Sequence, residues 1–314
     1  MNGDLQKRQK TLDSVVASLE KKRKSRIFCI IHNAPPYHLC NPDMGTVINS
    51  RADFKGIDTL EILVNSPGGH AQIAYELATF FRNHCRTLNI LVPIYATSAA
   101  TLLCLNADKI IMGEFAHLGP IDVQLSDELE HGKERFSPLA EFKSMQFLRE
   151  YAAESLEFLT NVLTDLGMSK RQALHEAIPG VAKMMEPLYS HVDPSRLGSY
   201  GRALAEAEEY AKRLLASVGN ADAEDIAQKL AWEYPTHDFV IYGAEAKSLG
   251  LPVEIMDSQL EATLVKSMMG LIRDEISYSG FVEPPAAKLK GTKQSKLPTP
   301  AKSGATLAVV GGKH

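Results

Sequence analysis

Between residues 59 and 113 the sequence alternates between short apolar runs and segments with helical periodicity, and few folds accommodate that alternation. Three runs are rich in Ile, Val and Leu, as buried strands are: 59–65, 90–96 and 109–113. Residues 71–84 carry apolar side chains at helical spacing, and residues 99–106 form a short apolar helical segment. This order of strands and helices predicts βαβ units, and therefore an α/β fold with a parallel sheet.

The same two patterns flank a long helical region. Further strands are predicted at 27–32, 239–242 and 253–256, and further helices at 244–249 and 259–277. Residues 137–233 read instead as almost continuous helix, with separate helices predicted near 169–177, 199–218 and 221–232. We therefore predict one α/β domain over residues 27–282 that carries a helical insertion at about 137–233, rather than two independent domains.

The two ends of the chain differ from this domain. Residues 1–26 hold the basic clusters KRQK and KKRKSR, and Val15, Val16 and Leu19 give them a thin apolar edge. This composition predicts a solvated leader helix; the alternative is a peripheral contact with an anionic membrane or an acidic partner. Residues 283–314 are rich in Pro and Lys and lack periodic apolar side chains, so we expect a disordered tail.

Charge and cysteine usage exclude several classes of protein. The formal net charge of -4 leaves no basic excess to neutralise phosphates, so we expect no nucleic-acid partner. The longest apolar stretch, 90–105, is interrupted by Pro93 and several polar residues, which predicts neither a membrane span nor a secretory signal. The four cysteines form no CxxC pair, which indicates reduced thiols and a cytoplasmic, or membrane-peripheral, location.

Two turns carry residues suited to chemistry. NSPGG (65–69) follows one predicted strand and precedes a helix, and its glycines allow a ligand to approach the main chain. By itself, such a turn is commonly a structural connection. The second turn, ATSAAT (96–101), has the same placement. A serine there usually caps the helix, but the neighbours of Ser98 are small and leave its hydroxyl open.

Sheet topology brings the two turns together. One helix links the strands 59–65 and 90–96, so they are expected to run parallel and end at the same edge of the sheet. The amides of Gly68, Gly69 and Ala99 would then lie beside the hydroxyl of Ser98. A nucleophile next to convergent backbone amides is the arrangement that acyl transfer requires.

These motifs resemble those of a known family. NSPGG, ATSAAT and the following NADKIIMGEFAHLGPID are similar to the Clp-type and signal-peptide-peptidase class of serine proteases with the crotonase-like fold. Within that class they resemble the serine dehydrogenase proteinase family, whose motifs correspond to residues 66–69, 95–101 and 118–124 here. The likeness resumes at 234–237 and 245–251, and covers the helical insertion loosely.

The resemblance implies site residues and partners. It implies Ser98 as the nucleophile and the amides of Gly68 or Gly69 and of Ala99 as the oxyanion hole. Ala100 stands where most relatives have glycine. Alanine is compatible with the helical conformation expected at this position. The resemblance also implies a homo-oligomer and a peptide or protein substrate.

Three residues compete for the role of general base. His117 lies a few residues earlier than the histidine of Clp-type enzymes. Lys212 sits in a segment similar to the lysine-bearing helix of archaeal membrane-bound relatives, and it borders an apolar stripe; it could act only if burial lowered its pKa. His237 has a ring suited to proton transfer, and Asp238 or Asp122 could orient it. The sequence ranks Lys212 narrowly ahead of His237 and does not decide between them.

We therefore predict a serine peptidase that works through an acyl-enzyme on Ser98. No metal or cofactor is expected, because the sequence holds no P-loop, no HExxH motif and no dinucleotide fingerprint. A crotonase-like acyl-CoA enzyme is one alternative, because such enzymes use the same oxyanion hole without a serine nucleophile. A non-catalytic oligomeric adaptor is the other; there Ser98 would only cap a helix and the helical insertion would bind a partner.

Overall fold

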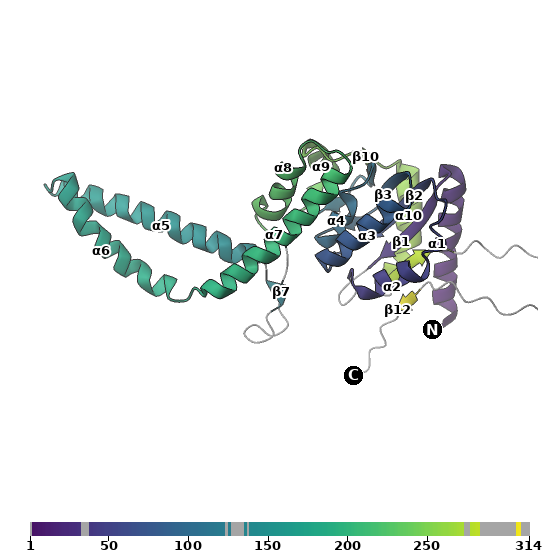
Figure 1. Cartoon of the computed structure of the whole chain (residues 1–314), viewed down its shortest axis with the longest axis horizontal. Coiled ribbons are helices and arrows are strands. Elements are labelled where there is room, and N and C mark those ends of the chain that lie inside the picture. Colours follow the sequence, from purple (N-terminus) through teal and green to yellow (C-terminus); the bar gives the residue numbers. More distant parts are fainter. Residues whose placement is uncertain are drawn as a thin grey trace, which may run out of the picture. The chain divides into compact units, whose positions relative to one another are not determined.

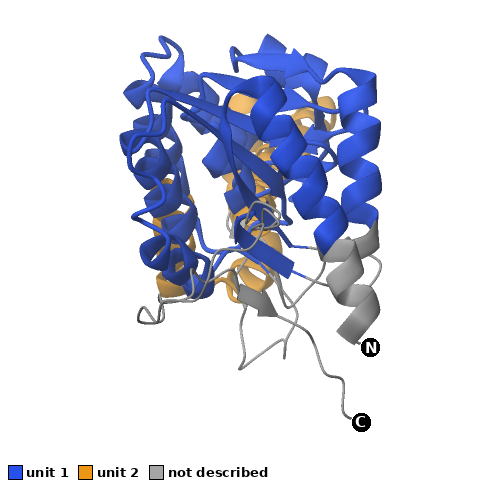
Figure 2. Ribbon diagram, turned by 90° about the vertical axis from the view of Figure 1, so that its right-hand side faces the viewer, with its two compact units in different colours: residues 1–121, 207–314 blue, residues 122–206 orange. Residues whose placement is uncertain are grey.

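The computed structural model describes residues 2–32, 38–122, 125–126, 135–136, 138–272, 277–282 and 306–308. The chain divides into two compact units (Figure 2). Unit 1 comprises Met1–Ile121 and Ala207–His314, and unit 2 comprises Asp122–Glu206. Because the sheet lies in unit 1 and the long helices of unit 2 interrupt it in sequence, the predicted α/β architecture with a helical insertion is confirmed in outline.

Unit 1 is built on a seven-stranded sheet in the order β10-β5-β3-β2-β1-β11-β12 (Figure 1). Five of these strands pair in parallel: β1 (Arg26–Ile31), β2 (Thr59–Asn65), β3 (Thr87–Val92), β5 (Lys109–Met112) and β10 (Val253–Ile255). The helices α3 (Ala71–Asn83) and α4 (Ala99–Cys104) connect strands of this sheet, as the βαβ pattern predicts.

Two antiparallel strands complete the sheet beyond β1, and the sequence did not predict them. β11 (Ser277–Phe281) pairs with β1, and β12 (Thr306–Ala308) pairs with β11. β11 covers the open edge of β1, which would otherwise expose its backbone groups. The prediction of a disordered tail is therefore wrong at 306–308, while most of 283–314 lies outside the described residues.

The sheet separates two apolar cores. Side chains alternate along β1, so that Phe28 and Ile30 face one core while Ile27, Cys29 and Ile31 face the other. The first core also holds side chains of α2 (Asn41–Asn49), α3, α4 and α8 (Ala223–Gln228). The second is closed by α1 (Asn2–Arg23) and α10 (Ser258–Ile272), which pack against each other.

The basic leader segment is a helix, but its interpretation as a solvated one is wrong. Leu12, Val16 and Leu19 of α1 are buried in the second core. Near the end of α1, Arg23 forms an ion pair at 2.7 Å with Glu61 of β2. The apolar edge that a membrane contact would use is therefore occupied within the chain, and that contact stays a prediction.

A small second sheet corrects the predicted strand at 90–96. That segment forms two strands, because β3 ends at Val92 and β4 (Tyr95–Ala96) joins β6 (His117–Leu118) and β9 (Ile241–Tyr242) in a three-stranded sheet. Pro93 has no N–H to donate to the ladder, and the chain leaves the large sheet there. β4 leads directly to Ser98.

Unit 2 is mainly helical. α5 (Pro138–Asp165) and α6 (Lys170–Tyr189) pack together as a hairpin, and α7 (Pro194–Ser217) starts in this unit (Figure 1). β7 (Leu125–Ser126) and β8 (Arg135–Phe136) pair antiparallel. The helix predicted near 169–177 continues to Tyr189 through Pro179 and Pro187. Burial of its residues Val181 and Met185 offsets the cost of the prolines.

The predicted boundaries of the insertion also need correction. Residues 207–233, which contain the end of α7, α8 and the π-helix η1 (Lys229–Glu233), belong to unit 1. Leu214, Ile226 and Leu230 are buried in the first core, together with residues of the sheet. The chain returns through α9 (Gly243–Ser248) to β10. In the described part of the chain, no helix combines the length and apolarity that crossing a membrane requires.

Candidate active site

The glycine-bearing turn lies at the C-terminal end of β2, where parallel sheets place their sites. Gly68 and Gly69 have φ values of +103° and +148°, which residues other than glycine rarely adopt. A Cβ on Gly69 would lie 2.6 Å from the backbone nitrogen of Leu39. The Leu39 N–H donates to the Gly68 carbonyl at 2.7 Å, and the Leu39 carbonyl accepts from His70 N–H at 3.0 Å. Backbone hydrogen bonds to Leu39 therefore hold one side of the turn in place.

Ser98 occupies a sharp turn between β4 and α4. Its φ of 54° and ψ of -126° fall outside the regions that most residues adopt. Among the described residues, Lys24 is the one other non-glycine position with positive φ. Ser98 stands at the N-cap position of α4, yet its side chain accepts no capping hydrogen bond. Ser98 is half-buried, and its hydroxyl does not serve as the helix cap.

The two turns are in direct contact, as the sheet topology predicts. The backbone of Ser66 bonds to both neighbours of the serine turn, accepting from Thr97 N–H at 3.1 Å and donating to the Tyr95 carbonyl at 3.2 Å. A Cβ added to Gly68 would come within 2.7 Å of the Ser98 Cβ. The glycine is therefore required for the turn to approach the serine this closely.

The candidate oxyanion amides differ in their partners. The Gly68 N–H donates to the Ser66 hydroxyl at 3.2 Å, so it is occupied. Within the described part of the chain, the amides of Gly69 and Ala99 have no hydrogen-bond acceptor. Of the three predicted amides, these two are therefore not engaged by the protein's own groups, and Gly69 is exposed while Ala99 is buried.

Lys212 lies on the exposed side of α7. The apolar stripe next to it is buried as predicted, including Leu204, Ala211 and Leu215. The Lys212 side chain is 41% exposed, and its ammonium donates to Glu224 at 2.8 Å. This hydrogen bond raises the pKa of Lys212, whereas a general base needs a lowered one.

The small sheet separates the two histidine candidates. Ala96 of β4 lies opposite Leu118 of the parallel strand β6, and Leu118 lies opposite Ile241 of the antiparallel strand β9. The ends of β4 and β6 therefore meet the start of β9 at one end of this sheet. Ser98 follows β4 and His237 precedes β9, so both chain segments emerge at that end.

His117 lies at the other end of the small sheet. It is the first residue of β6, and its ring stacks on Tyr95 with centroids 6.1 Å apart. Burial lowers the pKa of His117, and the ring is half-buried. Of the two residues considered as orienting groups, Asp122 is buried and Asp238 is exposed; the motif residues Val123 and Gln124 lie outside the described residues.

The structure contains a buried serine–histidine–aspartate arrangement that sequence reasoning missed. His32 Nδ1 lies 3.0 Å from Ser66 Oγ, and His32 Nε2 lies 3.1 Å from Asp43 Oδ1. His32 follows β1 and Ser66 follows β2, and these strands are in register, with Ile31 opposite Asn65. Knowledge of that register would have placed His32 beside Ser66. No spacing in the sequence indicates that Asp43 contacts His32.

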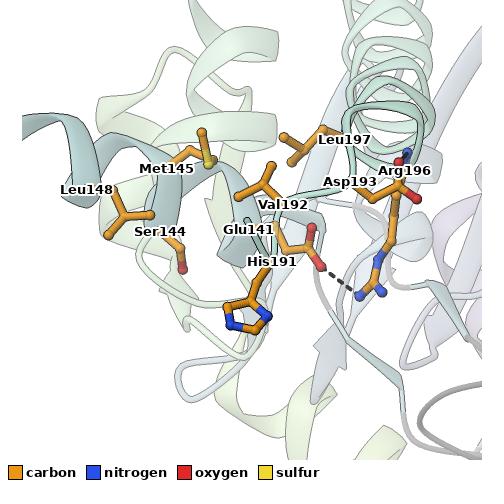
Figure 3. A pocket seen from close by; sticks show the side chains of 9 residues that line it. All are labelled: Glu141, Ser144, Met145, Leu148, His191, Val192, Asp193, Arg196 and Leu197. Carbon is orange, nitrogen blue, oxygen red and sulfur yellow. Dashed lines mark hydrogen bonds and ion pairs between the residues drawn. The ribbon is translucent and has the colours of Figure 1, made fainter. Parts of the chain in front are cut away.

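A separate pocket lies in unit 2 (Figure 3). It lies between the start of α5 and residues 191–197. Two of its lining residues, Arg196 and Glu141, form an ion pair at 2.7 Å. All of its lining residues belong to unit 2, whereas Ser98, Gly69, Ala99 and His237 belong to unit 1.

Comparison with known proteins gives one family and several relatives. The sequence model of the family described as ClpP-like SDH-type serine proteinase matches residues 2–130. An uncharacterized protein of Methanocaldococcus jannaschii is 26% identical over 278 residues, covering 86% of this chain and 81% of its own length. A second uncharacterized protein of that organism is 22% identical over 248 residues, covering 76% and 70%.

Two solved structures are similar to the chain. Both are mutants of the 1510-N membrane-bound stomatin-specific protease. The first has a TM-score of 0.39 and 13% sequence identity, over 72% of this chain and 76% of that one. The second, in complex with a substrate peptide, has a TM-score of 0.40 and 12% identity, over 82% and 89%.

Proposed function

Because residues 2–130 match the family of ClpP-like SDH-type serine proteinases, we propose that the chain cleaves peptide bonds through an acyl-enzyme on Ser98. The conformation of Ser98 is the observation that carries this proposal. Holding a non-glycine residue at positive φ costs roughly 1–2 kcal/mol, and such strain gathers at functional sites. Here the strained residue lies directly against Gly68, and its hydroxyl does not cap α4.

In the proposed reaction Ser98 Oγ attacks the carbonyl carbon of the scissile peptide while a base takes the hydroxyl proton. The amides of Gly69 and Ala99 donate to the oxyanion of the tetrahedral intermediate. The intermediate collapses to an acyl-enzyme as the protonated base gives its proton to the leaving amine. Water, deprotonated by the same base, then hydrolyses the ester and restores the Ser98 hydroxyl.

His237 is the base that the topology favours. Its segment starts β9 at the end of the small sheet from which β4 leads to Ser98. Lys212 has the opposite properties, because it is exposed and ion-paired with Glu224, which raises its pKa. We therefore assign proton transfer to His237 and none to Lys212.

Ser98 is a better nucleophile candidate than Ser66, although Ser66 is the serine bonded to a histidine. The Ser66 side chain is 0% exposed, and its oxygen is held by His32 and by the Gly68 amide. A substrate carbonyl cannot reach it without dismantling the turn. The half-buried Ser98 hydroxyl has no such restraint on it.

Labelling with a fluorophosphonate tests the proposal. The reagent phosphonylates an activated serine, and mass spectrometry of the digested protein identifies which one. We expect one label, on Ser98, and none in Ser98→Ala. Ser248→Ala, a matched change at an exposed serine of α9, should label like the wild type. A wild-type chain that neither labels nor cleaves peptides would overturn the proposal.

The same assay separates the two bases. His237→Ala should lower kcat by about 10²–10⁴-fold, the usual contribution of a general base. Lys212→Met should keep wild-type kcat and KM. A loss of kcat in Lys212→Met, with wild-type kcat in His237→Ala, would assign the base role to Lys212.

A further inference from the structure

The Gly68–Gly69 turn is held by a chain of buried polar side chains that have no part in the proposed reaction. Ser66, His32 and Asp43 are 0%, 3% and 3% exposed. Burying three such groups is costly unless each has a hydrogen-bond partner. They partner one another, and the last link of the chain is the backbone of the turn itself.

We propose that Asp43, His32 and Ser66 form a relay of positioning residues that fixes Gly68, and through it the direction of the Gly69 amide. The inference rests on the proposed function, because it assigns the Gly69 amide to the oxyanion hole. None of the three side chains would touch the substrate. Their effect would appear in the rate of the chemical step.

One assignment of protons satisfies every member of the relay. Asp43 accepts twice, from Cys40 N–H at 3.0 Å and from His32 Nε2–H at 3.1 Å. His32 Nδ1 then accepts the Ser66 hydroxyl proton at 3.0 Å, and Ser66 Oγ accepts from Gly68 N–H at 3.2 Å. The tautomer is assigned from the hydrogen-bond network rather than observed, and the Ser66 hydroxyl also lies 3.5 Å from the Gly68 carbonyl, a longer contact than the one to His32. The His32 ring thus links the Asp43 side chain at the start of α2 to the turn after β2.

The relay fixes the peptide that precedes the oxyanion amide. Gly68 is held at both of its polar atoms, its N–H by Ser66 and its carbonyl by Leu39 N–H at 2.7 Å. The Gly68 carbonyl and the Gly69 N–H belong to one planar peptide, so fixing the first fixes the second. Without these bonds the two glycines would have wide conformational freedom.

Ser66 also ties this peptide to the nucleophile. Its backbone bonds to Tyr95 and Thr97, which flank the serine turn, while its side chain bonds to Gly68. One residue therefore sets the spacing between the Gly69 amide and Ser98. A misaligned oxyanion donor loses most of its effect, because the bond to the transition state depends on distance and angle.

Steady-state kinetics of the full chain on a peptide substrate test the relay. Ser66→Ala and His32→Phe should each lower kcat by about 10–100-fold, a part of what a lost oxyanion donor costs, with little change in KM. The double variant should lose no more than the worse single variant, because both break the same chain. His32→Gln offers a donor and an acceptor at similar positions and should restore most of kcat.

A stability control separates positioning from general damage. Val47→Ala removes buried volume from α2, the helix that carries Asp43, and should lower the melting temperature without changing kcat well below it. If Ser66→Ala keeps wild-type kcat, or loses activity only in proportion to unfolded protein, the relay is wrong. That result leaves the proposed function standing when fluorophosphonate still labels Ser98. Labelling of Ser66 in place of Ser98 would overturn both proposals.

Discussion

At the scale of single residues, the site depends on backbone conformations that sequence and packing enforce together. Ser98 is held at positive φ without glycine, and Gly68 has no room for a side chain because Ser98 and Thr97 pack against it. Each residue constrains the other, so a side chain at position 68 would press directly on Ser98.

Gly68→Ala tests this dependence. Its Cβ would lie 2.7 Å from both Ser98 Cβ and the Thr97 carbonyl oxygen, at a φ of +103°. We expect the variant to lose fluorophosphonate labelling and about 2–4 kcal/mol of unfolding free energy, from the backbone strain and the overpacking together. Urea denaturation and labelling rates measure the two effects.

Gly167→Ala is the matched control for this prediction. Gly167 has a similar φ of +98°, and a Cβ there would meet nothing within 4 Å. It should cost only the strain, about 1–2 kcal/mol, and leave labelling unchanged. Equal loss of labelling in both variants would contradict the prediction.

The convergence of the two turns could be predicted from the sequence, because parallel strands joined by a helix end at one edge. The partners of the individual amides could not. Whether the Gly68 N–H faces a ligand or its own turn depends on where the Ser66 side chain points. That direction depends on His32 and Asp43, which come from elements far away in sequence.

At the scale of elements, ion pairs join α1 to the sheet, and the pair between Arg23 and Glu61 is more buried than the pair between Glu20 and Arg26. Glu61 of β2 is 1% exposed, and it accepts hydrogen bonds from Arg23, Ser25 and Asn89. The Arg23 bonds to Glu61 are as short as 2.7 Å. A buried carboxylate is tolerated in a strand only when it is neutralised and bonded in this way.

Arg23→Met should therefore destabilise unit 1. It leaves the Glu61 carboxylate buried beside apolar neighbours, and removal of one partner from such a pair costs about 3 kcal/mol. Lys22→Met removes a neighbouring exposed cation from the same last turn of α1 and should cost much less. Urea midpoints compare the two variants, and equal shifts would contradict a specific role for Arg23.

Element types could largely be read from periodicity, while several boundaries could not. Four strands of the parallel sheet, β1, β2, β5 and β10, and the helix α3 were predicted within a few residues of their bounds. The strand at 90–96 was not, because its apolar run continues through Pro93 although the ladder does not. α6 is longer than predicted because tertiary packing outweighs the two prolines that would end an isolated helix.

At the scale of the whole molecule, the proposed chemistry and the helical hairpin belong to different compact units. Ser98, Gly69, Ala99 and His237 lie in unit 1, whereas α5 and α6 lie in unit 2. The homo-oligomer implied by the family resemblance stays a prediction, which light scattering of the purified chain would check.

Val181→Asp tests the independence of the two units. Val181 lies on the buried face of α6, together with Ala173, Ala177 and Met185, and an aspartate there would place a charge inside the hairpin. We expect circular dichroism to show part of the helix melting at lower temperature while Ser98 keeps its labelling rate. Ile178→Asp, at an exposed position of the same helix, should change neither. Loss of labelling together with the helix would show that the units depend on each other.

The interruption of unit 1 by unit 2 has a consequence during protein synthesis. The ribosome releases Ser98 and the glycine turn early, but β9 and the segment that carries His237 follow only after all of unit 2 has been translated. Under the proposed mechanism, a nascent or prematurely terminated chain would thus hold the proposed nucleophile without the proposed base.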